Sequence, residues 1–190
     1  MTAALGTGTI TSITITPAGG MGIELPIADD VRRRAEAMVL KPGVGLDELK
    51  LGATREQAIA ALGPPADPNA GDLQYPLIGL SLNFDKEGRL RDIWGATPRE
   101  LENDGNPFFG HTDKGMRIGA TRAQVEAAYG KADEVEEALA KVRENVAPSE
   151  VIEYLTYNPL GLMVELKGGT VTAFVVQRAK PASSSQPATR

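Results

Sequence analysis

A run of acidic and amide side chains between residues 100 and 113 has the residue types best suited to chemistry. Carboxylate and amide oxygens are the ligands that a hard cation prefers, and "ELENDGNPFFGHTD" supplies six such side chains: Glu100, Glu102, Asn103, Asp104, Asn106 and Asp113. An EF-hand calcium loop needs oxygen ligands at alternating positions and a glutamate at the twelfth, and this spacing does not provide them. We therefore interpret the segment as a flexible acidic linker and predict no metal site.

No pattern in the sequence spells out a catalytic site. His111 is the single histidine, so a Ser-His-Asp triad would have to recruit it from "GHTDKG", which we interpret as a polar loop. The chain has no cysteine, which excludes disulfides and thiolate chemistry. Its glycine-rich stretches match neither a phosphate loop nor a dinucleotide fingerprint. We predict no catalytic residue and no cofactor.

Four aromatic side chains occupy places that a hydrophobic core does not require, and they are the candidates for a protein interface: Trp94, Phe108, Phe109 and Tyr154. Trp and Tyr are enriched among the residues that dominate protein interfaces. Phe108 and Phe109 have an alternative role, in which they pin the linker onto the seam between two repeats of the chain.

A twelve-residue phrase that occurs twice begins the elements that must position these side chains. "GATREQAIAALG" begins at Gly52 and "GATRAQVEAAYG" at Gly119, and eight of thirteen positions are identical between residues 51–63 and 118–130. In each phrase a threonine precedes a glutamine by three positions, the pattern of a capping box at a helix start. A glycine then closes the helix after about two turns. Such a helix is too short to be stable alone, so it must pack on something else.

Alternating apolar and polar residues after each phrase predict an antiparallel meander. Leu80, Leu82 and Phe84 alternate with polar residues before a turn at "DKEG", and residues 162–166 repeat the pattern before "KGG". Tyr75 and Tyr157 hold equivalent places ahead of these strands, which indicates a structural role. The second copy has 15 more residues between its glycine and its tyrosine, and the apolar spacing in residues 132–146 predicts a helical insert there.

The predicted fold class is therefore α+β. A tandem duplication of a short capped helix and an antiparallel meander forms one or two antiparallel sheets, with helices packed on one face. The predicted organisation is an N-terminal hairpin and helix at 1–45, a first repeat at 46–98, a second repeat at 99–178 and a disordered tail at 179–190. The N-terminal helix covers "ADDVRRRAEAMVL", from residue 28 to residue 40.

The repeated unit resembles that of the β-lactamase-inhibitor-like fold. The small outer-membrane-assembly lipoproteins of the SmpA/OmlA type are similar to it too, through "LGATREQAIAALGPP", a tyrosine-containing strand, "GLSLNF" and a glycine turn. The resemblance covers about residues 46 to 178. It implies a non-enzymatic protein that presents a sheet face or loops to another protein. This chain has no lipidation cysteine, and nothing at specific inhibitory positions carries over.

Composition limits the partners. With 20 basic against 25 acidic residues, the net charge is -5 and the pI near 5.0, which does not suit a nucleic-acid backbone. The sequence shows neither a transmembrane segment nor a signal peptide, so we expect a cytoplasmic protein, or a periplasmic one if a signal was removed.

These observations predict a protein–protein interaction module that acts as an inhibitor, immunity factor, adaptor or accessory subunit of a larger assembly. One alternative is a small-molecule or cation-binding protein, or a hydrolase, that uses carboxylates in a cleft between the repeats. Another is a structural subunit whose "TITSITIT" strand pairs with a neighbour.

Overall fold

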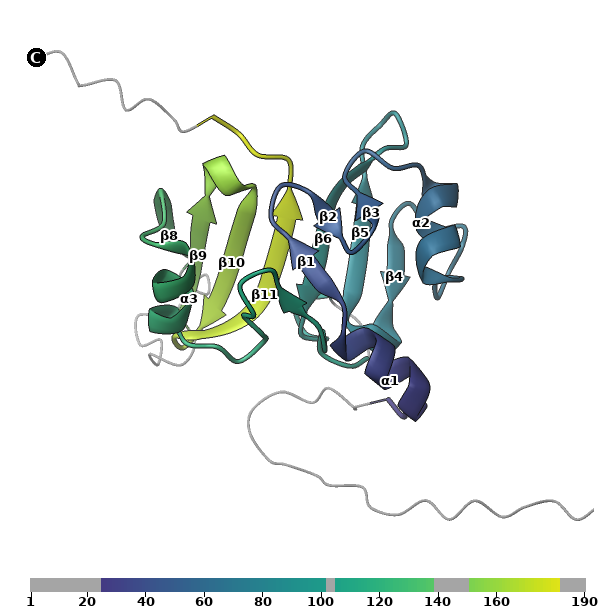
Figure 1. The fold of residues 1–190 in the computed structure, drawn as a ribbon, viewed down its shortest axis with the longest axis horizontal. Coiled ribbons are helices and arrows are strands. Elements are labelled where there is room, and N and C mark those ends of the chain that lie inside the picture. The colour runs from purple at the N-terminus through teal and green to yellow at the C-terminus, as the bar shows by residue number, and fades with distance from the viewer. Residues whose placement is uncertain (1–24, 102–104, 139–150, 182–190) are drawn as a thin grey trace, which may run out of the picture.

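The computed structural model describes residues 25–101, 105–138 and 151–181 (Figure 1). Within these ranges the chain forms three α-helices of eight residues each: α1 Asp29–Glu36, α2 Arg55–Leu62 and α3 Arg122–Tyr129. The strands form one sheet of seven strands and one of four, so the protein has a mixed α+β fold. None of the helices in these ranges is long and apolar enough to cross a membrane.

The larger sheet is antiparallel throughout and has the order β4-β5-β6-β11-β10-β9-β8. Its strands are β4 Leu73–Tyr75, β5 Leu80–Phe84, β6 Leu90–Ala96, β8 Glu134–Ala138, β9 Ile152–Tyr157, β10 Leu162–Lys167 and β11 Thr170–Gln177. Strand β6 pairs with β11 at the centre, where Trp94 lies opposite Val175. Two segments far apart in the sequence thus form one continuous sheet.

The smaller sheet has the order β3-β2-β1-β7, with β1 Val39–Lys41, β2 Gly45–Leu46, β3 Leu49–Lys50 and β7 His111–Thr112. Its presence corrects two predictions. The helix predicted to reach Leu40 ends at Glu36, because the next residues pair with both β2 and β7. The "GHTDKG" segment is not simply a polar loop, since His111 and Thr112 pair in parallel with β1. The N-terminal hairpin predicted within 1–45 lies mainly on residues outside the described ranges.

Helices α2 and α3 begin with the capping boxes that the sequence predicts. The hydroxyl of Thr54 accepts a hydrogen bond from the backbone N–H of Gln57 at 3.3 Å, and the Gln57 side chain accepts one from the Thr54 N–H at 2.8 Å. Thr121 and Gln124 form the same pair at 3.3 and 2.8 Å. These bonds satisfy backbone donors that a helix start otherwise leaves without partners.

Tyrosine side chains join the end of each of these helices to the larger sheet. The hydroxyl of Tyr75, at the end of β4, donates to the carbonyl of Gly63 at 3.1 Å. The hydroxyl of Tyr157, at the end of β9, donates to the carbonyl of Gly130 at 3.2 Å. This agrees with the structural role expected for both tyrosines.

A 3-10 turn follows each tyrosine, at Pro76–Ile78 and Asn158–Leu160, and each turn ends in a left-handed glycine. Gly79 has φ 65° and Gly161 has φ 66°. The Gly79 carbonyl accepts from the N–H of Ala96 at 3.0 Å, and the Gly161 carbonyl accepts from the N–H of Gln177 at 2.9 Å. Both turns are therefore fastened to the last residue of a central strand.

The prediction of a helical insert at 132–146 is wrong for its first part. Residues Glu134–Ala138 form strand β8, which pairs with β9 so that Val135 lies opposite Leu155 and Glu136 opposite Tyr154. Without β8, the edge of β9 would leave backbone donors and acceptors unpaired. Pairing with β8 satisfies these groups, and this gain outweighs the helix propensity of "EVEEA". Residues 139–150 lie outside the described ranges, as do residues 182–190 of the predicted tail.

One hydrophobic core joins the layers. Each helix contributes a fully buried side chain to it, namely Ala35, Ala58 and Val125, and the smaller sheet contributes Leu40 and Leu46. Inward residues of the larger sheet complete the cluster, among them Leu82, Ile93, Leu155, Val164 and Phe174. The helices α2 and α3 and the smaller sheet lie on one side of the larger sheet (Figure 1).

Candidate binding face

The opposite side of the larger sheet carries two rows of side chains. Because residues paired across neighbouring strands share a face, the register defines these rows directly. The first row comprises Gln74, Ser81, Trp94, Val175, Met163, Thr156 and Glu134. The second comprises Ala96, Ala173, Glu165, Tyr154 and Glu136. We call these rows, with the neighbouring pair Asn83 and Asp92, the open face.

The open face is not covered by any helix of the described ranges, since each of the three packs into the core on the other side. Trp94, Tyr154, Thr156 and Met163 are partly exposed there. The face is thus a surface of mixed aromatic and polar side chains held on a rigid sheet.

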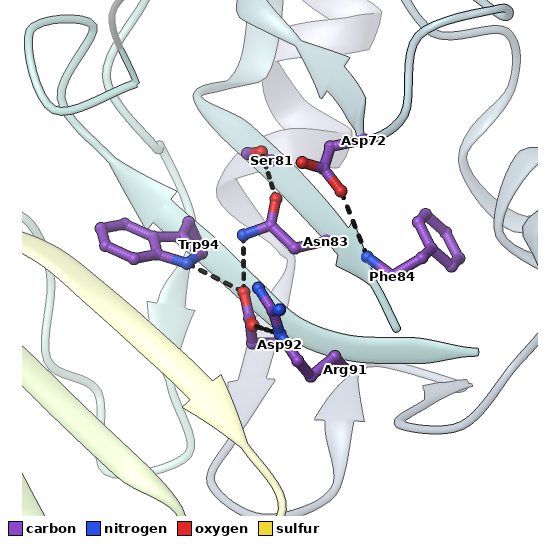
Figure 2. Close-up of polar contacts among 7 residues, drawn as sticks. All are labelled: Asp72, Ser81, Asn83, Phe84, Arg91, Asp92 and Trp94. Atoms are coloured by element: carbon purple, nitrogen blue, oxygen red, sulfur yellow. Dashed lines mark hydrogen bonds and ion pairs between the residues drawn. The ribbon is translucent and has the colours of Figure 1, made fainter. Parts of the chain in front are cut away.

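A chain of polar contacts fixes the part of the open face around Trp94 (Figure 2). Oδ1 of Asp92 accepts from the Trp94 indole N–H at 2.9 Å and from the Asn83 amide at 2.7 Å, while Oδ2 pairs with the Arg91 guanidinium at 2.6 Å. The Ser81 hydroxyl lies 3.3 Å from the Asn83 side-chain oxygen. A buried carboxylate with three donors holds its neighbours in fixed positions.

The segment after β6 lies over the centre of the open face. The N–H of Thr97 donates to the carbonyl of Thr172 at 2.9 Å. Leu101, 9% exposed, packs with Ala96, Ala173 and Trp94 in a small cluster separate from the main core. These contacts bring the Glu100 side chain to the edge of a hollow beside Trp94.

That hollow has a volume of about 190 Å³ and is lined by Gln74, Ser81, Asn83, Trp94, Glu100 and Leu101. Its walls combine an aromatic ring with amide, hydroxyl and carboxyl groups. This is the composition of a site that recognises a polar or charged group while burying some apolar surface.

Two carboxyl groups meet where the loop crosses the sheet. Burial, followed by the charge of Glu165 and a hydrogen bond to it, raises the pKa of Glu100. Glu165 is 3% exposed and accepts from the Thr172 hydroxyl at 2.6 Å. Burial also raises the pKa of Tyr154, with further contributions from Glu165 and Glu100, so its phenol stays protonated at neutral pH.

The four candidate aromatic residues divide into two pairs. Trp94 and Tyr154 both lie on the open face, one in each row. Phe108 is 2% exposed and lies in the main core, close to Gly79, Gly95 and Gly110. Phe109 packs against that core beneath the guanidinium of Arg32, 4.8 Å from its ring centroid. Both phenylalanines therefore pack with the main core, and neither belongs to the open face.

Sequence reasoning missed the polar members of the site. The alternation of Ser81 and Asn83 with apolar residues indicates that both share one face of a strand. That Asp92 lies beside Asn83, however, depends on the register between two strands. Glu165 was not predicted as a site residue, because the sequence does not show that it lies next to the loop that carries Glu100.

The acidic segment does not assemble as a cation site within the described ranges, where no three His, Asp or Glu side chains gather as metal ligands. Asp113 accepts a hydrogen bond from the Tyr129 hydroxyl at 2.8 Å. Asn106 is fully buried, and its amide donates to the carbonyls of Leu25 and Leu77, both at 3.0 Å. Residues 102–104 lie outside the described ranges.

Comparison with known proteins does not assign the chain to a family. No family model matches it, and no curated protein matches it. Among solved structures it is similar to a DUF4309 family protein, YjgB, from Bacillus subtilis subsp. subtilis str. 168. The identity is 13% and the TM-score 0.46, over 79% of this chain and 93% of that chain. Function has to be argued from the site itself.

Proposed function

We propose that the protein is a non-enzymatic interaction module that binds another protein through the open face. The observation that carries this proposal is the placement of Trp94 and Tyr154. They come from distant parts of the sequence, lie on the same side of one sheet and remain partly exposed. Three strand spacings separate their strands, or roughly 14 Å. Two aromatic anchors at this separation, with the partly exposed Met163 and the carboxyl of Glu165 on a strand between them, match the anatomy of a protein interface.

The rigidity of the face supports the same proposal. Asp92 holds the Trp94 indole, and Glu165 is opposite Tyr154 in the strand register. A partner that binds such a surface loses little conformational entropy in ordering it. The role of the module is that of an inhibitor, immunity factor, adaptor or accessory subunit.

We further propose that the two ends of the larger sheet arose by tandem duplication. Matched capping boxes, matched tyrosine contacts and matched left-handed glycines support this origin, together with the repeated sequence phrase. We also propose that this duplicated unit is related to the β-lactamase-inhibitor-like and SmpA/OmlA-type repeats that the sequence resembles.

Comparative capture from an extract of the source cells tests the interaction. The bait is the tagged protein, compared with a Trp94→Ser, Tyr154→Ser double variant and with a Leu77→Ser, Leu160→Ser control. Leu77 and Leu160 are exposed apolar residues, 44% and 40%, on the 3-10 turns and outside the two rows of the open face. We expect the control to retain a partner that the open-face variant loses. Equal capture by both variants would remove the basis of the proposal.

A second candidate is a small-molecule or cation-binding protein, or a hydrolase, in the region between the two ends of the sheet. The observation in its favour is the meeting of Glu100 with Glu165. However, hydrogen-bonded carboxyl groups are closer together than the roughly 5 Å or more that glycoside hydrolysis requires. A thermal-shift screen tests this candidate, because a saturating ligand raises the melting temperature.

A further inference from the structure

The open face is acidic around its aromatic residues, and this charge indicates what kind of partner side chain it accepts. Building on the proposed function, we propose that the partner presents an arginine or lysine, whose cationic side chain enters the hollow between Trp94 and Glu100. The inference concerns the chemistry of the bound segment, which the proposed function leaves open.

Charge complementarity is the first argument. Glu134, Glu136 and Glu165 belong to the two rows of the open face, and Glu100 is added by the loop above them. Asp92 already has a cationic neighbour in Arg91. Within the described ranges, by contrast, no ion pair includes Glu100 or Glu165. Within the described residues, a cation brought by the partner would meet two carboxyl groups that form no ion pair, of which Glu100 also experiences the charge of Arg99.

The hollow provides the second argument, because the residues that line it suit a cationic side chain. It has a volume of about 190 Å³ and opens to solvent. A cation there would lie beside the Trp94 indole ring, a favourable cation–π partner. The carboxyl of Glu100 and the side-chain oxygen of Asn83 would accept its N–H groups.

Titration of Glu100 provides a signature of such binding. The charges of Glu165 on β10 and of Arg99 on the same loop act on this carboxyl. The charges of Glu165 and Glu100 also raise the pKa of Tyr154 on β9. Burial and Glu165 raise the pKa of Glu100, so this carboxyl remains partly protonated at pH values where an ordinary glutamate is ionised. A bound cation favours the ionised carboxylate, so binding releases a proton and becomes tighter as pH rises through this pKa.

The experiment uses the single tryptophan of the chain as its reporter. One indole N–H signal in a ¹⁵N-correlated NMR spectrum then reports on the hollow without further assignment. The probes are N-acetylarginine amide and its uncharged isostere N-acetylcitrulline amide, titrated into the wild type, Glu100→Gln and Glu87→Gln. Glu87 lies in the exposed turn between β5 and β6, so its variant is a charge-matched control.

We expect the arginine probe to shift the indole signal and to bind about tenfold more tightly than the citrulline probe, as loss of one charge-assisted contact predicts. Glu100→Gln should abolish this preference and its pH dependence, and Glu87→Gln should retain both. The dispersed NMR spectrum shows directly whether each variant is folded. Equal binding of the two probes, no shift with either, or an unchanged preference in Glu100→Gln would overturn the inference.

This inference and the proposed function can fail separately. If the open-face double variant loses a partner but Glu100→Gln binds it as tightly as the wild type, the cation inference is wrong and the interaction proposal stands. If capture does not depend on the open face, the interaction proposal fails whatever the probes show.

Discussion

The indole nitrogen of Trp94 donates a 2.9 Å hydrogen bond to Oδ1 of Asp92, a residue that is only 7% exposed. The same oxygen accepts the Asn83 amide at 2.7 Å. A partly exposed aromatic ring on a flat sheet would otherwise sample several rotamers. Asp92 therefore acts as the positioning residue for the largest side chain of the open face.

Replacement of Asp92 should destabilise the fold and release the indole. In Asp92→Leu the Trp94 N–H and the Asn83 amide lose their acceptor, which should cost about 2–3 kcal/mol in the free energy of unfolding. Urea denaturation followed by tryptophan emission measures both effects, and the native-state emission should shift to longer wavelength. Glu87→Ala, at an exposed position, serves as the control and should change neither quantity. A wild-type unfolding midpoint for Asp92→Leu would show that the network contributes nothing.

The two tyrosine contacts should be similar in strength. Tyr75→Phe and Tyr157→Phe each remove only the hydroxyl that donates to a glycine carbonyl after a helix. We expect each to lower the free energy of unfolding by about 1 kcal/mol. Chemical denaturation of both variants in parallel checks this. A clear loss in one variant and none in the other would contradict the view that both helices are held to the sheet in the same way.

The cost in stability of replacing a left-handed glycine by alanine should depend on the space available for the added Cβ. A Cβ at Gly79 would overlap the backbone nitrogen of Phe108, and one at Gly161 would overlap the carbonyl oxygen of Gln177. Gly88 has a similar φ of 71°, but a Cβ added there would meet no atom within 4 Å. Gly88→Ala should therefore cost only the conformational strain, about 1–2 kcal/mol.

Gly79→Ala and Gly161→Ala should cost at least about 3 kcal/mol, because backbone must move as well. Thermal denaturation of the three variants ranks them. If all three lose the same stability, steric contact at Gly79 and Gly161 is not the reason for glycine.

The raised pKa of Glu100 predicts a specific pH dependence of stability. A carboxyl whose pKa is higher in the folded state binds its proton more tightly there, so its contribution favours folding below the usual pKa of 4.5 and is lost as pH rises through the raised value. Glu100→Gln removes this titration. As pH rises from acidic to neutral, the unfolding midpoint of the variant should therefore increase relative to that of the wild type. Parallel pH profiles in the two proteins would argue against a shared proton between Glu100 and Glu165.

Local signals in the sequence specify local structure well. Thr54 with Gln57, and Thr121 with Gln124, predict two helix starts, because the capping box is formed by residues three positions apart. Which side of such a helix faces the core is not set locally, since in α2 Ala61 is exposed while Ile59 and Leu62 pack against the core. Position on a two-turn helix depends on what the helix packs against.

The open face could be predicted only in part, because its members meet through strand register. Trp94 and Tyr154 are visible as candidates from residue type alone. The contact between Asp92 and Asn83 requires knowledge of how β5 pairs with β6, and the meeting of Glu100 with Glu165 requires knowledge of how β6 pairs with β11. The strand at Glu134–Ala138 was missed for a related reason, since an edge that needs a partner overrides local helix propensity.

Site-specific photo-crosslinking tests the central claim most directly. A benzophenone-bearing residue replaces Met163, which is partly exposed in the first row of the open face, or Leu160, which is exposed on the adjacent 3-10 turn. Irradiation in the source cells should give a covalent adduct with a second protein from position 163 and none from position 160. Adducts from position 160 alone, or none from either position, would contradict binding through the open face.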